Sequence, residues 1–78
     1  MRITVKLFAT LHQYQPAAPR SGMALEVPPD STVAEILPRL RIPEAAPLVA
    51  MVNEKVEHLD CVLHEGDVLS LFPPVAGG

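Results

Sequence analysis

The sequence lacks several features that would assign it to a common functional class. Its only cysteine, Cys61, excludes an internal disulfide and fits a reducing compartment. The six Lys and Arg residues are scattered and the net charge is −3, which argues against a nucleic-acid partner. The longest apolar run, residues 45–52, contains Pro47 and is far shorter than the roughly 20 residues that span a bilayer. Residues 1–8 lack the apolar segment of a secretory signal, so we expect a cytoplasmic protein with no membrane partner.

Catalytic and metal-binding patterns are also missing. His12, His58 and His64 show no metal-ligand spacing and no cysteine pair accompanies them, so we expect no metal site. The sequence contains no phosphate-binding loop and no catalytic triad. Cys61 lies among apolar neighbours, which is typical of a small core or turn residue rather than a nucleophile. These absences argue against a metalloenzyme and against catalysis by a triad or a phosphate-binding loop.

The remaining pattern is that of one small domain rich in strands. Its 78 residues allow a single domain, and hydrophobic residues make up 49% of them. Strict alternation predicts a strand over residues 2–8, in which Ile3, Val5 and Leu7 share one face. Apolar runs bounded by turn residues predict four more strands, over residues 23–27, 48–53, 56–59 and 68–72. Between the third and fourth strands, Asn53 begins a tight turn and tolerates a left-handed backbone.

The strongest helix pattern follows the second strand. Thr32 and Glu35 are spaced as a capping box, in which each side chain binds the other's backbone amide. An apolar stripe at helical spacing comes next: Val33, Ile36, Leu37 and Leu40. Pro38 removes one backbone hydrogen bond inside this run, so we expect one short helix that ends near Leu40 or Arg41.

The sequence after the last strand is a small, bare tail: Pro73, Pro74, Val75, Ala76, Gly77 and Gly78. Pro73 and Pro74 lack amide hydrogens and should project the chain away from a sheet in polyproline II geometry. Gly77 and Gly78 have no Cβ atom, so their backbone can enter a slot too narrow for other residues. At roughly 3.3 Å per residue, the tail would carry the carboxylate of Gly78 about 20 Å from the domain, far enough to reach another protein's active site.

These elements together predict an α+β fold. A hairpin, a helix that crosses one face and a return strand bring the first and last strands together, because crossovers are short and right-handed. This arrangement is a β-grasp: a mixed sheet of four to five strands, one main helix on one face and an extended C-terminal tail. We expect a domain over residues 1–72 and a flexible tail over residues 73–78.

Five segments of the chain carry a family resemblance: residues 5–11, 31–35, 52–53, 65–68 and 72–78. Through them nearly the whole chain resembles the ubiquitin-like sulfur carriers of the MoaD/ThiS type, most closely the small subunit of molybdopterin synthase. The last segment, FPPVAGG, is the most specific, because carriers that serve thiamine synthesis end in Gly-Gly without the proline pair. One departure is at residues 11–13, which read Leu-His-Gln where the family commonly has an Arg-Glu pair.

The resemblance implies a chemistry for the tail. An E1-like adenylating enzyme would use ATP and Mg²⁺ to join the carboxylate of Gly78 to AMP, and a sulfur donor of the desulfurase or rhodanese type would displace AMP to leave a thiocarboxylate. Inserted into the synthase large subunit, the thiocarboxylate would donate sulfur to a cyclic pterin precursor in molybdenum or tungsten cofactor biosynthesis. The family also implies a carrier that binds no cofactor and supplies no catalytic side chain. It implies a heterotetramer of two small and two large subunits.

Strand parity predicts where partners bind. If Leu69 and Leu71 face the helix, the alternate residues of the sheet face outward. Four apolar side chains would then gather on the uncovered side of the sheet as an open-face patch: Phe8, Val49, Met51 and Phe72. Exposed apolar patches commonly bind partners. An inverted strand phase would bury these residues instead, and an incidental scatter of apolar groups would carry no function.

Other functions stay open at this level. The chain could carry sulfur for thiamine, cysteine or a dedicated tungsten pathway. It could be a ubiquitin-like modifier whose Gly78 is joined to lysines of other proteins. It could also be a binding module to which the tail contributes nothing, in which case deleting Gly77 and Gly78 would leave its function intact.

Overall fold

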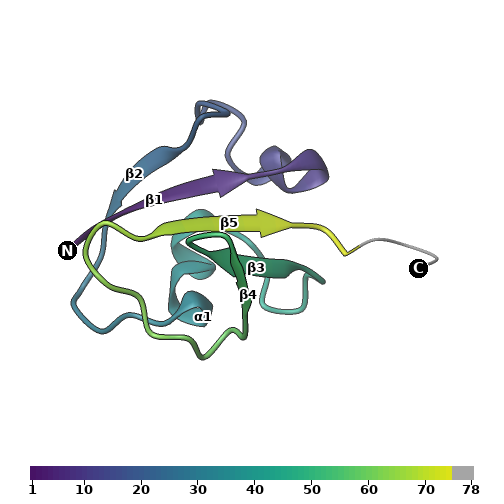
Figure 1. Ribbon diagram of the computed structural model, residues 1–78. Helices are drawn as coiled ribbons and strands as arrows, with labels where there is room; N and C mark the ends of the chain where they lie inside the picture. The colour runs from purple at the N-terminus through teal and green to yellow at the C-terminus, as the bar shows by residue number, and fades with distance from the viewer. Residues whose placement is uncertain (75–78) are drawn as a thin grey trace.

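The computed structural model describes residues 1–74. Its elements are, in chain order, β1 (Arg2–Leu7), η1 (Ala9–Tyr14), β2 (Met23–Glu26), α1 (Val33–Ile36), η2 (Pro38–Leu40), β3 (Val49–Val52), β4 (Lys55–Glu57) and β5 (Val68–Phe72). Here η1 and η2 are 3₁₀ helices. The five strands form one sheet in the order β2-β1-β5-β3-β4 (Figure 1).

The sheet is mixed, with its only parallel pair among these residues at the centre. β1 pairs antiparallel with β2 and parallel with β5, while β3 pairs antiparallel with both β5 and β4. The predicted β-grasp is therefore confirmed, including the hairpin at the start and the adjacency of the first and last strands. Each predicted strand is present. The bounds of β5 and the starts of β1 and β2 are as predicted, and the other bounds differ by one or two residues because the ends of strands fray into turns.

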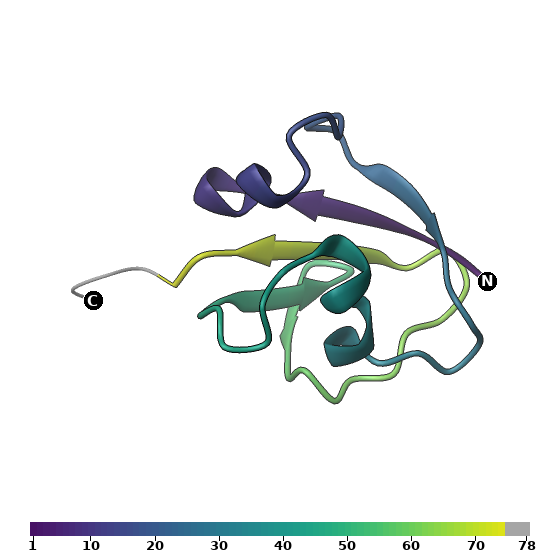
Figure 2. The ribbon, with the colours of Figure 1, turned by 180° about the vertical axis from the view of Figure 1, so that it is seen from behind.

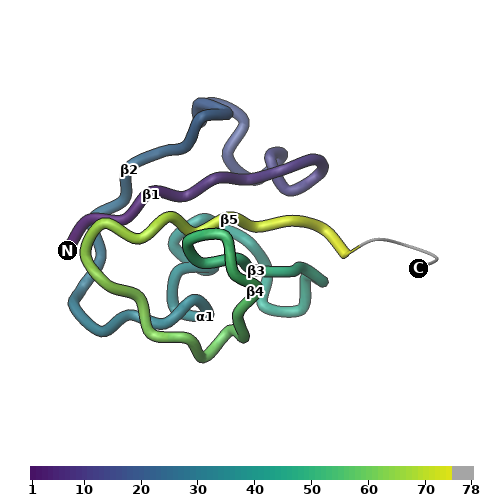
Figure 3. The backbone as a smooth tube through the Cα atoms, viewed as in Figure 1, coloured from purple at the N-terminus to yellow at the C-terminus, as the bar shows by residue number. Residues whose placement is uncertain are grey.

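The core lies between the sheet and the helical segments that cover one of its faces (Figure 2). The tube trace shows the chain that follows α1 passing behind β5 and β3 (Figure 3). Leu69 and Leu71 of β5 are fully buried, as are Ile36 of α1 and Leu40 of η2. Burial of each such side chain contributes about 1.5–3 kcal/mol, so the parity that turns Leu69 and Leu71 inward fixes the register of β5.

The predicted short helix is present, but it does not continue as an α-helix to Leu40 or Arg41. α1 ends at Ile36 and a separate 3₁₀ turn, η2, begins at Pro38 and ends at Leu40. Arg41 then takes a left-handed conformation with φ of 64°, which closes the run at the predicted place. The predicted capping box is present: the Thr32 amide donates to Glu35 Oε1 at 2.8 Å, and the Glu35 amide donates to Thr32 Oγ1 at 3.3 Å.

The turn between β3 and β4 is fastened to the start of β5. Asn53 and Glu54 have φ of 50° and 72°, so the predicted left-handed turn is confirmed. Asn53 Nδ2 donates to Asp67 Oδ1 at 2.8 Å, and the Val68 amide donates to Asn53 Oδ1 at 3.0 Å. The Asn53 amide also donates to the Val68 carbonyl at 2.9 Å. Asn53 thus links the hairpin to β5, a role that its turn propensity alone does not predict.

The sheet ends where the tail was predicted to begin. β5 stops at Phe72, and Pro73 and Pro74 follow it outside any strand. Pro73 is half-buried and Pro74 is exposed. The other predicted tail residues, Val75, Ala76, Gly77 and Gly78, lie outside the described residues.

Candidate functional site

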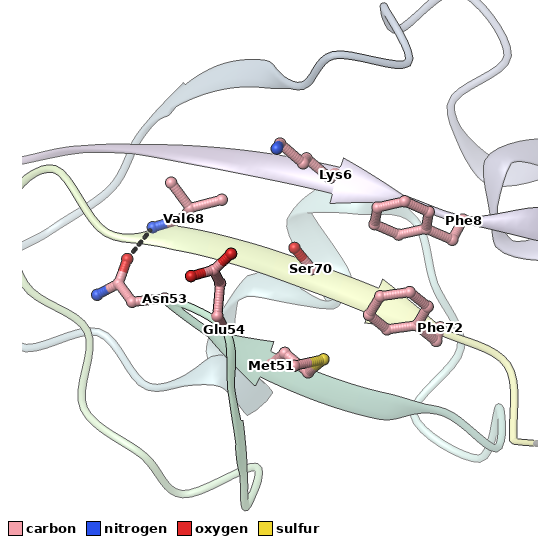
Figure 4. A pocket seen from close by; sticks show the side chains of 8 residues that line it. All are labelled: Lys6, Phe8, Met51, Asn53, Glu54, Val68, Ser70 and Phe72. Atoms are coloured by element: carbon pink, nitrogen blue, oxygen red, sulfur yellow. Dashed lines mark hydrogen bonds between the residues drawn. The ribbon is translucent and has the colours of Figure 1, made fainter.

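The four residues of the open-face patch come together on the side of the sheet that α1 does not cover. Met51 is paired with Ser70, and Val49 is paired with Phe72, in the antiparallel register of β3 and β5. Ala50, between Val49 and Met51, and Val52, which follows Met51, are buried on the opposite face. The strand phase is therefore the predicted one, and it places Met51 and Phe72 beside each other (Figure 4).

A stacked pair of aromatic rings ends the patch. The ring centroids of Phe8 and Phe72 are 4.3 Å apart and their planes differ by 9° (Figure 4). The Phe8 amide donates to the Leu71 carbonyl at 3.0 Å, and this backbone hydrogen bond fixes Phe8 beside Phe72. Such a pair contributes about 0.5–1.5 kcal/mol beyond the area that it buries. Phe72 was predicted to be exposed and is half-buried, because Phe8 covers one side of its ring.

Two shallow hollows adjoin these rings. The larger, of about 540 Å³, extends from Phe8, Met51 and Phe72 toward the polar side chains of Lys6 and Glu54. Its floor is β5, where Ser70 faces the solvent (Figure 4).

The smaller hollow lies where the chain leaves the sheet. It has a volume of about 420 Å³ and is lined by Ala9, Val49, Met51, Phe72 and Pro73. The point from which the tail departs is therefore surrounded by apolar side chains, and their burial against a partner is favourable because it removes apolar surface from water.

The arrangement suits docking better than side-chain catalysis. Among the described residues, the only charged side chains that line the hollows are those of Lys6 and Glu54, with the amide of Asn53 between strands β3 and β4. The one thiol, Cys61, does not line either hollow. Partial burial and then the carboxylates of Glu57, Asp67 and Asp60 raise the pKa of the Cys61 thiol, which disfavours the reactive thiolate.

Within residues 1–74 the structure brings no three His, Cys, Asp or Glu side chains together as a metal site would require. In the same part of the chain, no helix has the length and apolar character needed to cross a membrane.

Sequence reasoning missed two features of this site. It did not anticipate the Phe8–Phe72 stack, since the register of β1 against β5 becomes known only when both strands are placed. It also missed Lys6, whose outward position on β1 follows from the same alternation that buries Val5 and Leu7. The role of Phe8, Val49, Met51 and Phe72 in binding a partner stays a prediction.

Comparisons with known proteins place this geometry in context. The model of the ThiS family matches residues 5–78. A comparison with curated protein sequences gives no significant match. Among solved structures, SAMP1 from Haloferax volcanii has 26% identity and a TM-score of 0.75, with 100% of each chain covered.

Two further structures show the same fold at 24% identity. One is a putative molybdopterin converting factor, subunit 1, from Pyrococcus furiosus, with a TM-score of 0.76 and coverage of 96% of this chain and 99% of that one. The other comes from the complex of subunits 1 and 2 of the molybdopterin-converting factor of Helicobacter pylori, with a TM-score of 0.63 and 100% of each chain covered.

Proposed function

Because the chain belongs to the ThiS family and is a ubiquitin-like sulfur carrier of the MoaD/ThiS type, we propose that it serves as the small subunit of a molybdopterin synthase. The observation that carries the proposal is the exit point of the tail. β5 ends at Phe72 inside the open-face patch, and Pro73 and Pro74 follow at once. The proline pair is the part of the tail that separates the molybdopterin branch from carriers for thiamine synthesis.

The proposed reaction takes place at Gly78. An E1-like enzyme uses ATP and Mg²⁺ to convert its carboxylate to an acyl adenylate, because a free carboxylate is a poor electrophile. The terminal sulfur of a persulfide on a desulfurase or rhodanese type donor displaces AMP to form an acyl disulfide. A thiol then reduces this disulfide and leaves the thiocarboxylate. The carrier contributes the reacting C-terminal group, and the enzymes that receive the tail contribute the catalytic residues.

In this proposal the domain is the part of the carrier that partner enzymes recognise. Every enzyme that receives the tail must also meet its point of departure, where Phe8 and Phe72 stack and Val49 and Met51 lie beside them. We propose that the activating enzyme and the large subunit of the synthase both bind this patch, so that they exclude each other. The two prolines restrict the stem before binding and thereby lower the ordering cost of insertion. In the Helicobacter pylori complex, a subunit 1 of the same fold is assembled with subunit 2.

The intact mass of the protein purified from its own cells tests the carrier role. We expect a fraction heavier by the replacement of one oxygen with sulfur, absent when Gly78 is deleted and retained in the control Ala76→Gly. Conversion of the pterin precursor to a dithiolene by this fraction with a synthase large subunit tests the pathway. A thiocarboxylate that no such subunit accepts would leave the carrier role intact and overturn the molybdopterin assignment.

A second function is favoured by the likeness to SAMP1, which is the Haloferax volcanii small archaeal modifier protein 1. At 26% identity over both whole chains, that protein is as similar to this one as the molybdopterin converting factors are. If the chain is a modifier, Gly78 is joined through isopeptide bonds to lysines of other proteins. Mass spectrometry of digested cell protein would then detect remnants of the tail on target lysines, and these would disappear when Gly78 is deleted.

A further inference from the structure

A second hollow surface lies on the helical side of the molecule, away from the open-face patch. It is a groove of about 410 Å³ between α1, the chain that follows η2 and Leu59. Leu37 and Ile42, both almost fully buried, form its floor. Leu59, one of the few large apolar side chains that the domain exposes, forms one wall at 41% exposure, and the exposed Ala34 lies beside it. We call this surface the α1 groove.

Backbone hydrogen bonds hold both sides of the α1 groove in place. The Ala34 amide donates to the Leu59 carbonyl at 2.8 Å, which ties the wall to the first turn of α1. The Ile42 amide donates to the Leu37 carbonyl at 3.0 Å, and the left-handed Arg41 between them returns the chain beside the helix. The groove is therefore formed before any ligand arrives, so a ligand need not supply the free energy of ordering it.

The rim of the α1 groove is acidic. Within the part of the chain that the structure describes, Glu35 and Glu44 are its only charged lining residues, and both are exposed. The carboxylate of Glu35 is oriented in advance, because its Oε1 accepts from the Thr32 amide at 2.8 Å and from Thr32 Oγ1 at 3.1 Å. The nearby basic residue Arg39 is directed elsewhere, since its guanidinium donates to the Glu26 carbonyl at 2.8 Å.

We propose that the α1 groove is a second docking surface, which binds a partner-protein segment that combines apolar and basic side chains. An apolar side chain lies over Leu37 and Ile42 and packs against Leu59, and flanking Arg or Lys side chains meet the carboxylates of Glu35 and Glu44. The charge of the rim selects this occupant over an acidic or purely apolar one. None of the groove's lining residues belongs to either hollow at the tail, so a protein bound here leaves the open-face patch free.

This surface gives the carrier a way to be held by one protein while its tail is processed by another. Enzymes that share the open-face patch must exchange, and a carrier held only by that patch is released at each exchange. A partner in the α1 groove remains bound throughout and raises the effective concentration of the carrier near the next enzyme. The inference does not depend on which pathway receives the sulfur.

A titration of the ¹⁵N-labelled full chain followed by NMR tests the proposal. The probe is an amide-capped synthetic peptide, AARLLRAA, and its counterpart AAELLEAA serves as the charge control. We expect saturable shifts of the amides of Ala34, Ile42 and Leu59 with the basic peptide, and none with the acidic one. The amides of Met51 and Ser70, on the other face, should not move.

Variants assign the binding to the rim. Glu44→Lys should weaken the affinity at least tenfold, whereas Glu54→Lys, which makes the same charge change beside the open-face hollow, should leave it within twofold. Both side chains are exposed, so both variants should fold. Absence of saturable shifts at the α1 groove, shifts that centre on Met51 and Ser70, or equal effects of the two variants would each overturn the proposal.

Discussion

Replacement of Asn53 tests how firmly the β3–β4 hairpin is held to β5. Asn53→Ala removes two side-chain hydrogen bonds, the one donated to Asp67 Oδ1 at 2.8 Å and the one accepted from the Val68 amide at 3.0 Å. Both are exposed to solvent, so water replaces them in part, and together they contribute about 1.5 kcal/mol. Alanine at φ of 50° adds about 1 kcal/mol of backbone strain, because it lacks the short polar side chain that lets asparagine tolerate the left-handed region.

The free energy of unfolding should therefore fall by about 2.5 kcal/mol in Asn53→Ala, which lowers the Tm by about 10–20 °C in a domain of this size. Asn53→Gly loses the same hydrogen bonds without the strain, and its free energy of unfolding should fall by about 1.5 kcal/mol. Urea denaturation followed by far-UV circular dichroism gives these values, since the chain has no tryptophan for fluorescence.

Glu54→Ala is the matched control for this series. Glu54 has φ of 72°, so alanine and glutamate bear the same kind of left-handed strain there. No side-chain hydrogen bond of Glu54 occurs within residues 1–74, and the variant should keep its stability within about 0.5 kcal/mol of the wild type. The reasoning is refuted if Asn53→Ala costs less than about 0.5 kcal/mol, or if Glu54→Ala costs as much as Asn53→Ala.

Three further outcomes are expected from the same structure. Phe8→Leu should lower the free energy of unfolding by about 1 kcal/mol, because the stacking with Phe72 is lost. It should also remove the ring-current shift of the Phe72 protons in NMR spectra, and unchanged Phe72 shifts would contradict the stacked geometry. Because its pKa is raised, the Cys61 thiol should react with iodoacetamide in a pH–rate profile whose midpoint lies at higher pH than that of an unstructured peptide thiol. Glu57→Gln should move this midpoint to lower pH, and an unmoved midpoint would show that Glu57 does not act on the thiol. Pro38→Ala should change the free energy of unfolding by less than about 1 kcal/mol, because Pro38 is the first residue of η2, a position at which the missing amide hydrogen costs little. A gain near 3 kcal/mol would show instead that Pro38 interrupts a continuous helix.

The fold was predictable because its local patterns agree with one another. Alternation placed Leu69 and Leu71 on the core face and Met51 on the other, and the structure confirms both phases. The capping box at Thr32 located the start of α1 to the residue. These patterns are short-range, and each is imposed by a period or a hydrogen bond that the sequence displays directly.

What the sequence did not display depends on contacts between distant segments. The stacked Phe8 and Phe72 meet only because β1 and β5 are neighbours in a particular register. Asn53 reads as a turn residue, yet its side chain is bound by Asp67 and Val68, which follow it by more than a dozen positions. The α1 groove likewise exists because Leu59 returns to α1 from the far end of the sheet. Only three-dimensional placement reveals such partners.

The parallel pairing of β1 with β5 makes formation of the sheet depend on the first and last strands together. β1 is the first strand and β5 the last, and they form the centre of the sheet. Until Leu69 and Leu71 have been synthesised, the core lacks two fully buried side chains and β1 lacks a neighbour along one edge. Pairing between such distant segments also slows folding, because the whole intervening chain must be gathered first. We therefore expect a chain interrupted before β5 to lack the folded open-face patch, so that a partner which binds this patch selects chains that contain the strand leading into the tail.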